Sequence, residues 1–443
     1  MLTLAAALGC GGASGEPTVD APSVVDAAVD ATSPDAAAAA TDYLLFAPIG
    51  STTTYLMDRA GQLVHSWPSS RRPGQSVQLL DDGHLLRTEA LPSSTFTAGG
   101  IGGAVTTYAW DGAVVWTYSY ATAAHHAHHD AVWLPDGHAV MLAWETVPAA
   151  QALGFGRDAA LLPTTGDVWA DHLIEIDPAT DQIVWEWHVI DHLVQDRDPT
   201  KPGYGALADH PERIDANLVA RRVNDWTHAN AVAYDAALDQ LIVSAHNANE
   251  VWIIDHGTTT AEAAGRTGGR RGRGGDLLYR WGNPASYGAG TAADQIFYGQ
   301  HNAQWIGAGL DGAGDLLVFN NGSQQARPYS TIDQLTPPLA ADGTYGSGAG
   351  GWGPTSLTWQ HQADPPTSLY AANISGAQRL PNGNTLVCVG PAGRFLEVTP
   401  GHADVWSYTY PGASGVFRVT SYPADHPALR GRALPPLGPV PST

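Results

Sequence analysis

The chain has 443 residues, and its 50 Gly, 31 Pro and 15 Trp with only 14% charged residues are typical of many short strands joined by turns. The formal net charge of −22 makes nucleic acid and anionic membrane surfaces unfavourable partners. The single lysine, Lys201, lies outside any Gly-x-x-x-x-Gly-Lys loop, which disfavours a nucleotide ligand. An anionic substrate therefore needs a local cationic pocket that works against the overall charge.

Residues 1–10 predict a signal segment. The short apolar run Leu4–Gly9 ends in small residues directly before Cys10, as at a bacterial lipoprotein cleavage site. Signal peptides begin with basic residues, but no Lys or Arg precedes this run, so we expect the natural start to lie upstream. The pattern predicts lipidation at Cys10. It also predicts an exported protein that contacts a membrane only through this N-terminal anchor.

Composition divides the rest of the chain into three parts. Residues 11–41 are rich in Ala, Asp, Pro, Ser, Thr and Val and lack aromatic residues, which predicts a disordered acidic tether. Patterned sequence follows over residues 42–432, and the Pro-rich residues 433–443 predict a loose tail. Cys388 lies in the apolar run Thr385–Val389, so we expect a buried, inert thiol. The sequence beyond the first residues contains no apolar stretch of about 18 residues, so it predicts no membrane-spanning helix.

An internal repeat runs through residues 42–432. Each unit begins with an apolar strand, an Asp-Gly or Asn-Gly turn and a second apolar strand. The clearest copies are Ser76–Leu86, Ala131–Leu142 and Ala377–Cys388. Most units then carry a second hairpin, and four strands per unit predict an all-β fold, a six-bladed β-propeller with four-stranded antiparallel blades, rather than a sandwich or a solenoid. Tyr43–Trp67 is too short for a whole blade, so we expect the C-terminal strand Val416–Thr420 to complete it and close the ring.

The last strand of most units combines a tryptophan with another aromatic residue. The four tryptophans are Trp116, Trp185, Trp281 and Trp406. We expect them on the outer strands of the blades, packed between neighbours.

Aligning the units on their innermost strands predicts a shared site at the mouth of the central channel. His129, His228 and His301 come just before these strands in three units, whereas a fourth unit has Ile374-Ser375-Gly376. Metal binding is one possible chemistry, favoured by the run His125–His129. Nucleophilic histidine catalysis, a quinone cofactor and ligand binding without catalysis are the others. No Gly-x-Ser-x-Gly turn supports a serine nucleophile.

Several long motifs resemble the bacterial aryl-sulfate sulfotransferase family, and the resemblance covers roughly residues 43–432. The motifs are Asp225–Asn230, Trp252–Thr260, Gly275–Pro284, Gln300–Ile306, Phe319–Gly322 and Ser375–Thr385, together with the linking stretches Trp185–Val189 and Asp191–Gln195. The resemblance implies a periplasmic six-bladed propeller that uses no cofactor. It also implies transfer of a sulfuryl group from a phenolic sulfate ester to a phenol through a sulfohistidine, without phosphoadenosyl phosphosulfate.

The same resemblance implies roles for particular residues. His228 and His301 match active-site histidines of the family, and Arg327 matches a sulfuryl-binding arginine. The position of His129 in the repeat adds it to the expected catalytic residues, and Asn230, Asn302 and Asn321 are expected to bind substrate. We expect His129, His228, His301 and Arg327 to converge at one end of the channel. An arginine suits this place because it can donate two hydrogen bonds to a sulfuryl group.

One position departs from the family pattern. The covalently sulfated histidine of characterised members is expected near Ala371–Ser375, where this chain has none, and neither His361 nor His402 fits the repeat. Either another histidine at the mouth is the nucleophile, or the chemistry differs. The alternative interpretation is a cell-surface propeller that binds a ligand without catalysis or has a different activity, including a metal-dependent one that uses the histidine cluster.

Overall fold

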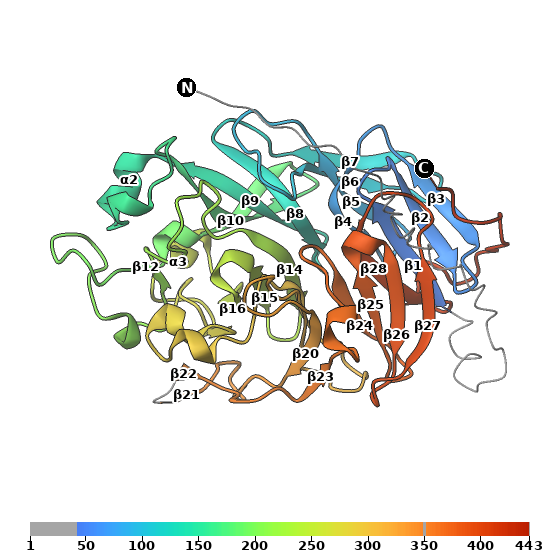
Figure 1. Cartoon of the computed structure of the whole chain (residues 1–443). Helices are drawn as coiled ribbons and strands as arrows, with labels where there is room; N and C mark the ends of the chain where they lie inside the picture. Colours follow the sequence, from blue (N-terminus) through green and yellow to red (C-terminus); the bar gives the residue numbers. More distant parts are fainter. Residues whose placement is uncertain (1–41, 349–350, 443) are drawn as a thin grey trace, which may run out of the picture.

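The computed structural model describes residues 42–348 and 351–442, and within them six four-stranded antiparallel sheets surround a common centre (Figure 1). Each sheet is one blade of a propeller. Blade 1 is β28 (Val416–Pro423), β1 (Asp42–Pro48), β2 (Thr53–Asp58) and β3 (Leu63–Pro68); blade 2 is β4 (Pro73–Leu79), β5 (Leu85–Ala90), β6 (Gly103–Tyr108) and β7 (Val114–Ser119); blade 3 is β8 (His125–Trp133), β9 (Ala139–Val147), β10 (Val168–Asp177) and β11 (Gln182–His188). Blade 4 is β14 (Ala229–Asp235), β15 (Gln240–Ala245), β16 (Glu250–Asp255) and β17 (Tyr279–Trp281); blade 5 is β18 (His301–Trp305), β19 (Leu316–Asn320), β20 (Thr331–Leu335) and β23 (Trp359–His361); blade 6 is β24 (Gly376–Arg379), β25 (Thr385–Val389), β26 (Arg394–Val398) and β27 (Asp404–Thr409). The predicted all-β, six-bladed fold is confirmed.

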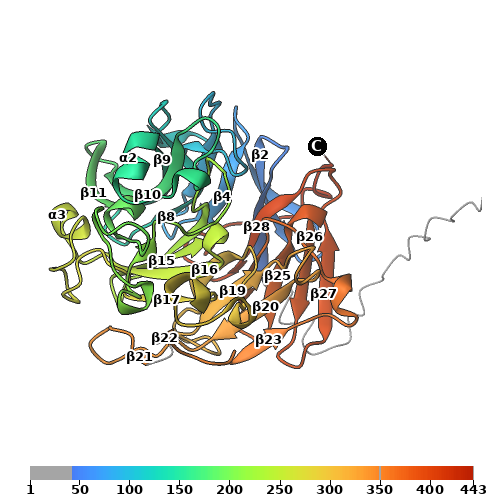
Figure 2. The same ribbon diagram turned by 60° about the vertical axis from the view of Figure 1, so that its left-hand side comes forward.

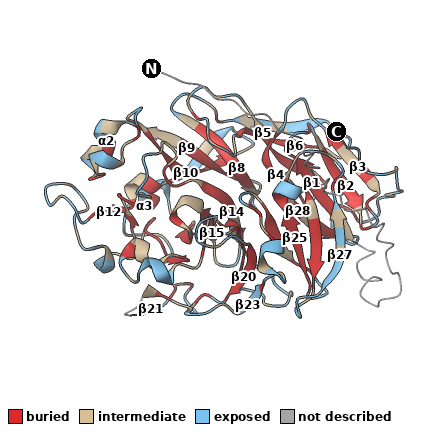
Figure 3. Ribbon diagram, viewed as in Figure 1, coloured by how far each residue is buried: buried red, intermediate tan, exposed pale blue. Residues whose placement is uncertain are grey.

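The first strand in each of these sheet orders lies innermost. The strands β28, β4, β8, β14, β18 and β24 contact one another in turn around the ring and line a central cavity of about 290 Å³. In Figure 3 the strands around the centre are largely buried, while exposed residues gather in the loops at the rim. The predicted alignment of the repeats is therefore correct.

The ring is closed by pairing the two ends of the propeller. β28 runs antiparallel to β1, with Asp42 opposite Pro423 and Phe46 opposite Val419. Because β28 also lies innermost, the last strand of the chain completes both the first blade and the wall of the central cavity.

A tryptophan on the outermost strand of every blade bonds to the next blade. Each indole Nε1–H donates to an oxygen of the following blade at 2.8–3.2 Å, and the six residues are Trp67, Trp116, Trp185, Trp281, Trp359 and Trp406. The four expected tryptophans are thus at the predicted places. The repeat of this contact around the ring adds Trp67 and Trp359 to them.

The hydrophobic core of the described residues is divided among the six interfaces between blades, with one large cluster of buried side chains at each. A small seventh cluster joins Phe96, in the loop between β5 and β6, to Trp144 and Trp169 of blade 3. Aromatic and branched residues project alternately from the strands into these clusters, which is the arrangement that buries both faces of each sheet. Cys388 belongs to the cluster between blades 6 and 1 and is 1% exposed, and burial raises the pKa of its thiol to about 12. The expected inert thiol is therefore buried in the core.

Small elements decorate the outer parts of the ring, as Figure 2 shows for α2 (Ala149–Gly154) and α3 (Thr260–Ala263). Two sheets of two strands add to them; they pair β12 (Leu193–Val194) with β13 (Ile214–Asp215) and β21 (Ser347–Gly348) with β22 (Gly351–Trp352). Across residues 42–348 and 351–442, no helix has the length and hydropathy needed to cross a bilayer.

The Pro-rich C-terminal residues 433–443 are not loose where the structure describes them. Leu63 N donates to Gly438 O at 2.8 Å, Leu437 N donates to Leu63 O at 2.7 Å, and Val440 is buried. The tail therefore packs against the start of β3, because its backbone and apolar side chains find partners there. The expected signal segment, the lipidated Cys10 and the tether over residues 11–41 lie outside the described residues.

Candidate active site

Three innermost strands begin with an irregular turn that directs a histidine into the channel mouth. His129 and His228 have left-handed backbones, with φ of 52° and 48°, and in blade 5 Asn302, next to His301, has φ of 54°. Strand pairing shifts register at each of these places. Bulges of this kind re-aim a side chain, and left-handed residues other than Gly are uncommon and concentrate at functional sites.

The three predicted histidines converge, and a fourth joins them. Ring centroids are 4.8 Å apart for His129 and His228, 5.0 Å for His228 and His246, and 5.4 Å for His246 and His301. Phe417 of β28 lies 6.1 Å from His129 and 6.4 Å from His301. We call His129, His228, His246 and His301 the mouth cluster.

His228 is paired with a carboxylate. Its Nδ1 hydrogen-bonds Oδ2 of Asp225, three residues earlier, and Oδ1 of Asp225 accepts the indole N–H of Trp144 at 3.0 Å. Burial favours the neutral imidazole, but the Asp225 carboxylate outweighs it and raises the pKa of His228 above its ordinary value. Among the described residues, Nε2 of His228 has no hydrogen-bond partner. His228 is therefore the member of the mouth cluster suited to carry a proton.

His301 uses both ring nitrogens. Its Nδ1 lies 3.0 Å from the carbonyl oxygen of Gly299 and 2.8 Å from Oδ1 of Asn321, so Nδ1 carries the hydrogen. Its Nε2 accepts the backbone N–H of Ile374 at 3.1 Å. Burial lowers the pKa of His301 to about 3. This neutral imidazole thus fixes the loop of blade 6 in which the family pattern expects a histidine.

His129 ends a chain of three residues. Nε2 of His128 faces Oδ1 of Asp171 at 2.9 Å, and Nδ1 of His128 lies 2.9 Å from Nδ1 of His129. The contact with Asp171 lacks hydrogen-bond geometry, whereas the two Nδ1 atoms are hydrogen-bonded to each other, so one of them donates and the other accepts. Burial, followed by the neighbouring imidazoles, holds the pKa of His129 well below its ordinary value.

His246 is the member of the mouth cluster that the repeat alignment misses. It follows β15 rather than preceding an innermost strand, and it lies in the short turn His246–Ala248 between β15 and β16. Its Nδ1 lies 3.0 Å from Oδ1 of Asn247, and burial and the adjacent His228 hold its pKa well below the ordinary value. The sequence signal was present as His246-Asn247-Ala248-Asn249, but it has no counterpart in the other units.

A polar cavity of about 430 Å³ opens beside His246, within the range of small-molecule sites. Its lining comes from blades 4 and 5 and from the loop that leads to blade 6, and includes Arg221, His246, Tyr298, Ser323 and Tyr370. We call it the mouth cavity. Arg221 is the only cationic residue in this lining, and its Nη2 donates to Oδ1 of Asn247 at 3.3 Å.

The contacts of Arg327 are with its own blade and the loops beside it. Its guanidinium donates to Asn320 O and to Thr331 Oγ1, both at 3.0 Å, and lies against the rings of Tyr298 and Tyr329. The side chain is partly buried, and its Nε has no hydrogen-bond partner among the described residues. None of these contacts is with a histidine of the mouth cluster, so the expected convergence of Arg327 with the histidines stays a prediction.

The three asparagines expected to bind substrate connect neighbouring parts of the ring. Asn230 Nδ2 donates to Gln300 O at 2.8 Å, and Asn302 Oδ1 accepts from Ala377 N at 3.0 Å. Asn321 Nδ2 donates to the backbone of the loop before blade 6, and its Oδ1 accepts from His301. All three are buried, so their amides hold neighbouring backbone segments and His301 in place and do not face the mouth cavity.

The run His125–His129 does not point to one ion. His125 stacks on Tyr120, His126 Nε2 bonds Gly102 O at 3.1 Å, and His128 faces Asp171. Each ring is thus committed to a different neighbour. Two other groups bring three possible ligand atoms together, Glu145 with His172 and His188, and Asp136 with His138 and Glu175. In the first group the rings of His172 and His188 are parallel within 1°, so their lone pairs do not converge on one point.

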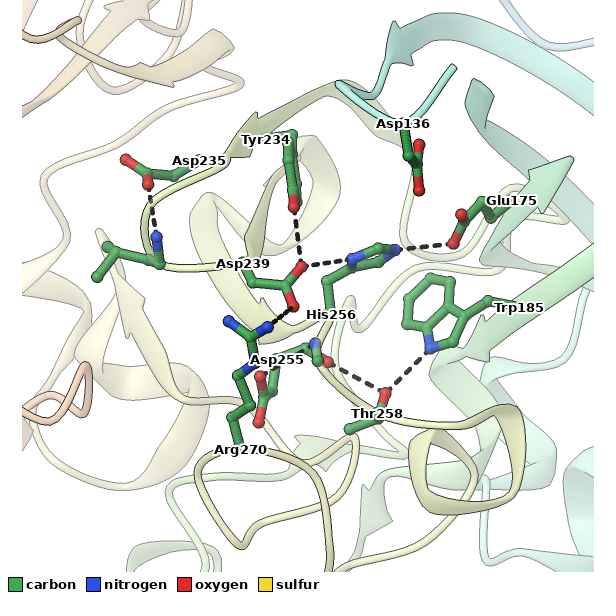
Figure 4. Close-up of polar contacts among 12 residues, drawn as sticks. Asp136, Glu175, Trp185, Tyr234, Asp235, Asp239, Asp255, His256, Thr258 and Arg270 are labelled. Atoms are coloured by element: carbon green, nitrogen blue, oxygen red, sulfur yellow. Dashed lines mark hydrogen bonds and ion pairs between the residues drawn. The ribbon is translucent and has the colours of Figure 1, made fainter. Parts of the chain in front are cut away.

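The second group is part of a line of alternating charges on the opposite face. Figure 4 shows His256 between two carboxylates, with Nδ1 2.8 Å from Oδ1 of Asp239 and Nε2 2.9 Å from Oε2 of Glu175. Oε1 of Glu175 lies 2.6 Å from Nδ1 of His138. We call Asp239, His256, Glu175 and His138 the carboxylate–imidazole chain. β16 runs from the turn that carries His246 to the residue before His256, so this chain lies at the far end of the propeller from the mouth cluster.

Comparison with known proteins agrees with the motifs. Solved structures with similar chain courses include a protein of unknown function from Bacteroides caccae, with 12% identity, 86% of this chain and 98% of that chain covered, and a TM-score of 0.47. A periplasmic gluconolactonase from Pseudomonas aeruginosa has 12% identity, coverage of 89% and 100%, and a TM-score of 0.43. No curated protein matches the sequence. The family model described as Arylsulfotransferase (ASST) matches residues 31–342, well over half of the chain. The protein is therefore a member of the arylsulfotransferase family.

Proposed function

We propose that the protein transfers a sulfuryl group from an aryl sulfate to a phenol through a histidine intermediate in the mouth cluster. The observation that carries this proposal is the convergence of four imidazoles beside a cavity in a member of the arylsulfotransferase family. Three of the four have lowered pKa values, so they are neutral and keep a lone pair at physiological pH. A neutral imidazole is a nucleophile that can accept and pass on such a group.

The reaction has two balanced halves. An imidazole nitrogen attacks the sulfur of the ester, the N–S bond forms, and the S–O bond to the aryl group breaks as the leaving phenol takes a proton. A second phenol then attacks the sulfur, gives up its proton and leaves as the new sulfate ester. The same acid–base group can serve both halves.

The proposed donor is an aryl sulfate and not phosphoadenosyl phosphosulfate. A nucleotide donor would need several cationic contacts for its phosphates, whereas Arg221 alone supplies positive charge to the lining of the mouth cavity. The aromatic side chains in that lining, Tyr298 and Tyr370, suit a phenyl ring instead.

The test is incubation with 4-nitrophenyl sulfate and phenol, with release of nitrophenol and formation of phenyl sulfate measured together. We expect both products in equal amounts, without added nucleotide and with no change on addition of a chelator. Absence of phenyl sulfate would contradict the proposal. Activity that is lost on chelation and restored by zinc would favour the metal-dependent alternative.

We also propose that the protein is exported and acts in the periplasm or on the outer membrane as a lipoprotein attached through Cys10. The apolar run before Cys10 supports this location. Mass spectrometry of the mature protein should find an acylated cysteine as its first residue. An N-terminus that retains the residues before Cys10 would contradict the lipoprotein proposal.

A further inference from the structure

The mouth cluster contains only one imidazole that combines a free nitrogen, a neutral ring and an opening to the mouth cavity. His301 has no free nitrogen, since Nδ1 donates to Gly299 O and Asn321 Oδ1 while Nε2 accepts from Ile374 N. It therefore cannot attack a sulfur atom without losing the contact that fixes the loop before blade 6.

His129 is covered from the side of the adjacent loop. A Cβ atom at Gly100 would lie about 2 Å from the ring of His129, so only a glycine fits over this imidazole. His129 is 3% exposed and is absent from the lining of the mouth cavity. A substrate in that cavity does not meet its Nε2.

His228 is also absent from that lining, but its side chain is 16% exposed and its ring centroid lies 5.0 Å from that of His246, so it stands beside a group held on His246. Its Nε2 is free, but its carboxylate partner gives the ring a different charge. The Asp225 carboxylate faces Nδ1 and stabilises the protonated ring, which has no lone pair on Nε2. A protonated imidazole donates a proton to a leaving group and does not attack an electrophile.

His246 is left with the lone pair on Nε2 because of its neighbour Asn247. The Nδ2 group of Asn247 donates to the backbone carbonyls of Asp225 at 2.9 Å and Trp226 at 3.3 Å. These two bonds fix the orientation of the Asn247 amide, so that its Oδ1 faces Nδ1 of His246. Because Oδ1 can only accept a hydrogen bond, Nδ1 of His246 must carry the hydrogen. The tautomer with a free Nε2 follows from these three contacts.

The surroundings of His246 leave this nitrogen accessible. Its side chain is partly exposed and lines the mouth cavity. Gly299 lies next to the ring, and a Cβ there would come within 3.0 Å of Nε2. Arg221 lines the same cavity, so it supplies positive charge to the space in which a sulfuryl group on Nε2 would lie. Its hydrogen bond to the Asn247 oxygen, which faces Nδ1 of His246, ties its guanidinium to this part of the mouth.

We propose that Nε2 of His246 is the atom that takes the sulfuryl group, with His228 as the general acid and Arg221 as the cation that faces the sulfuryl oxygens. This inference rests on the proposed sulfuryl transfer and adds the residue that performs it. The lone pair of Nε2 forms the N–S bond as the S–O ester bond breaks, and His228 gives its proton to the departing phenolate. In the second half the acceptor phenol returns that proton to His228 as its oxygen replaces the nitrogen on sulfur. Nδ1 of His246 keeps its hydrogen throughout.

The first experiment locates the sulfuryl group directly. The whole protein is mixed with 4-nitrophenyl sulfate without acceptor, quenched in alkaline denaturant and mapped by peptide mass spectrometry. We expect one sulfuryl group per chain on the peptide that contains His246 and its release on addition of phenol. A sulfuryl group on another histidine would overturn this inference and leave the proposed function standing. No transfer to phenol by the unmodified protein would remove the proposed function itself.

The second experiment separates a nucleophile from a structural residue. His246→Ala should lower transfer at least about 100-fold with every donor, and added imidazole should restore part of it, because free imidazole can occupy the vacated space and carry the sulfuryl group. The matched control is His84→Ala in an exposed turn of blade 2, which should leave the rate unchanged. A His246→Ala protein with full activity, or one that is folded but not rescued by imidazole, would contradict the assignment.

The third experiment tests the division of roles. His228→Gln should retain sulfuryl uptake from 4-nitrophenyl sulfate, whose leaving group needs little protonation, and lose about 100-fold with unsubstituted phenyl sulfate. His246→Ala should lose both donors equally. Equal losses with the two donors in His228→Gln would remove His228 from the role of general acid.

Discussion

At the channel mouth four histidines pack against one another, whereas at the opposite face His138 and His256 lie among carboxylates. The pKa values of His129, His246 and His301 are lowered, first by burial and then, for His129 and His246, by neighbouring imidazoles. Those of His138 and His256 are raised, because Glu175 and its neighbours outweigh burial. The surroundings thus favour the neutral form of the same side chain in one region and the protonated form in the other.

The difference between the two regions shows that the hydrogen-bond partners of the ring nitrogens decide which protonation state of a histidine is favoured. His256 faces an acceptor on each nitrogen, so both nitrogens donate only when the ring is protonated. His246 faces an amide oxygen on one nitrogen and open space on the other, which favours the neutral form. His228 is the intermediate case, with one carboxylate partner inside the neutral cluster, and this suits an acid–base role.

The sharpest test of this comparison is removal of the one carboxylate paired within the mouth cluster. Asp225→Asn should lower kcat with an unactivated aryl sulfate at least about 100-fold, because burial then sets the pKa of His228 and the general acid is lost at neutral pH. The alkaline limb of the kcat profile should move to lower pH. Asp181→Asn is the matched control, since Asp181 also accepts an indole N–H but lies on the outer edge of blade 3. An unchanged pH profile in Asp225→Asn would show that the carboxylate does not set the charge of His228.

The carboxylate–imidazole chain should respond in stability and not in catalysis. Glu175→Gln leaves His138 and His256 without their shared partner in a site where Glu175 is 5% exposed, so we expect a loss of about 2–4 kcal/mol in unfolding free energy and a lower Tm. Turnover per folded molecule should not change. Glu186→Gln, which alters a partly exposed carboxylate 3.9 Å from His188, should cost less than about 0.5 kcal/mol. Equal losses of unfolding free energy in the two variants would mean that the carboxylate–imidazole chain stabilises the protein no more than a surface ion pair does.

Arg221 offers a smaller test at the mouth. Arg221→Gln should raise KM for the aryl sulfate about tenfold, with a weaker effect on kcat, because the cation contacts the sulfuryl oxygens in both the ground state and the transition state. Its neighbour Arg222, whose Nε donates to Leu162 O, provides the control Arg222→Gln. If both substitutions raise KM equally, the general charge of the loop and not the position of Arg221 attracts the substrate.

The smallest expected effect is the dependence of stability on pH. The raised pKa values of His138 and His256 mean that their contribution is fully present below their ordinary value of 6.5 and is lost as pH rises through the folded values. The lowered pKa values of Glu175 and Asp239 mean that their contribution is lost only in acid, below 4.5 and 3.8. The difference in Tm between the unmodified protein and Glu175→Gln should therefore be greatest between about pH 5 and 6.5 and shrink toward pH 9. If this difference in Tm grows with pH instead, His138 and His256 are not protonated in the carboxylate–imidazole chain.

Much of the fold could be predicted because short local motifs mark each strand and turn of the repeat. Asp-Gly and Asn-Gly turns mark the hairpins, and the tryptophans mark the outer strands. Trp67 and Trp359 were missed because their strands lack the aromatic pattern that surrounds the other four, although all six indoles make the same contact. The packing of Gly438 against Leu63 was missed because nothing in a Pro-rich sequence identifies a distant partner.

The site was predicted in part for similar reasons. His129, His228 and His301 share a position in the repeat, so their convergence follows from the fold alone. His246 is reached only through the turn after β15, and its importance depends on where Asn247 finds its carbonyl partners. Arg327 bonds Asn320 and Thr331 within its own blade, and spacing along the chain does not reveal these partners.

The closure of the ring by β28 has a consequence for the mouth cluster. Phe417 packs against two histidines of the mouth cluster, and Arg418 pairs with Asp130 at 2.8 Å in the cavity below them. Phe417 and Arg418 follow every histidine of the mouth cluster in the chain, so the cluster is complete in sequence before it is complete in space. The seam between the two ends of the propeller and the floor of the channel mouth are therefore the same piece of backbone. Loosening that seam should disturb the imidazoles as well as the first blade.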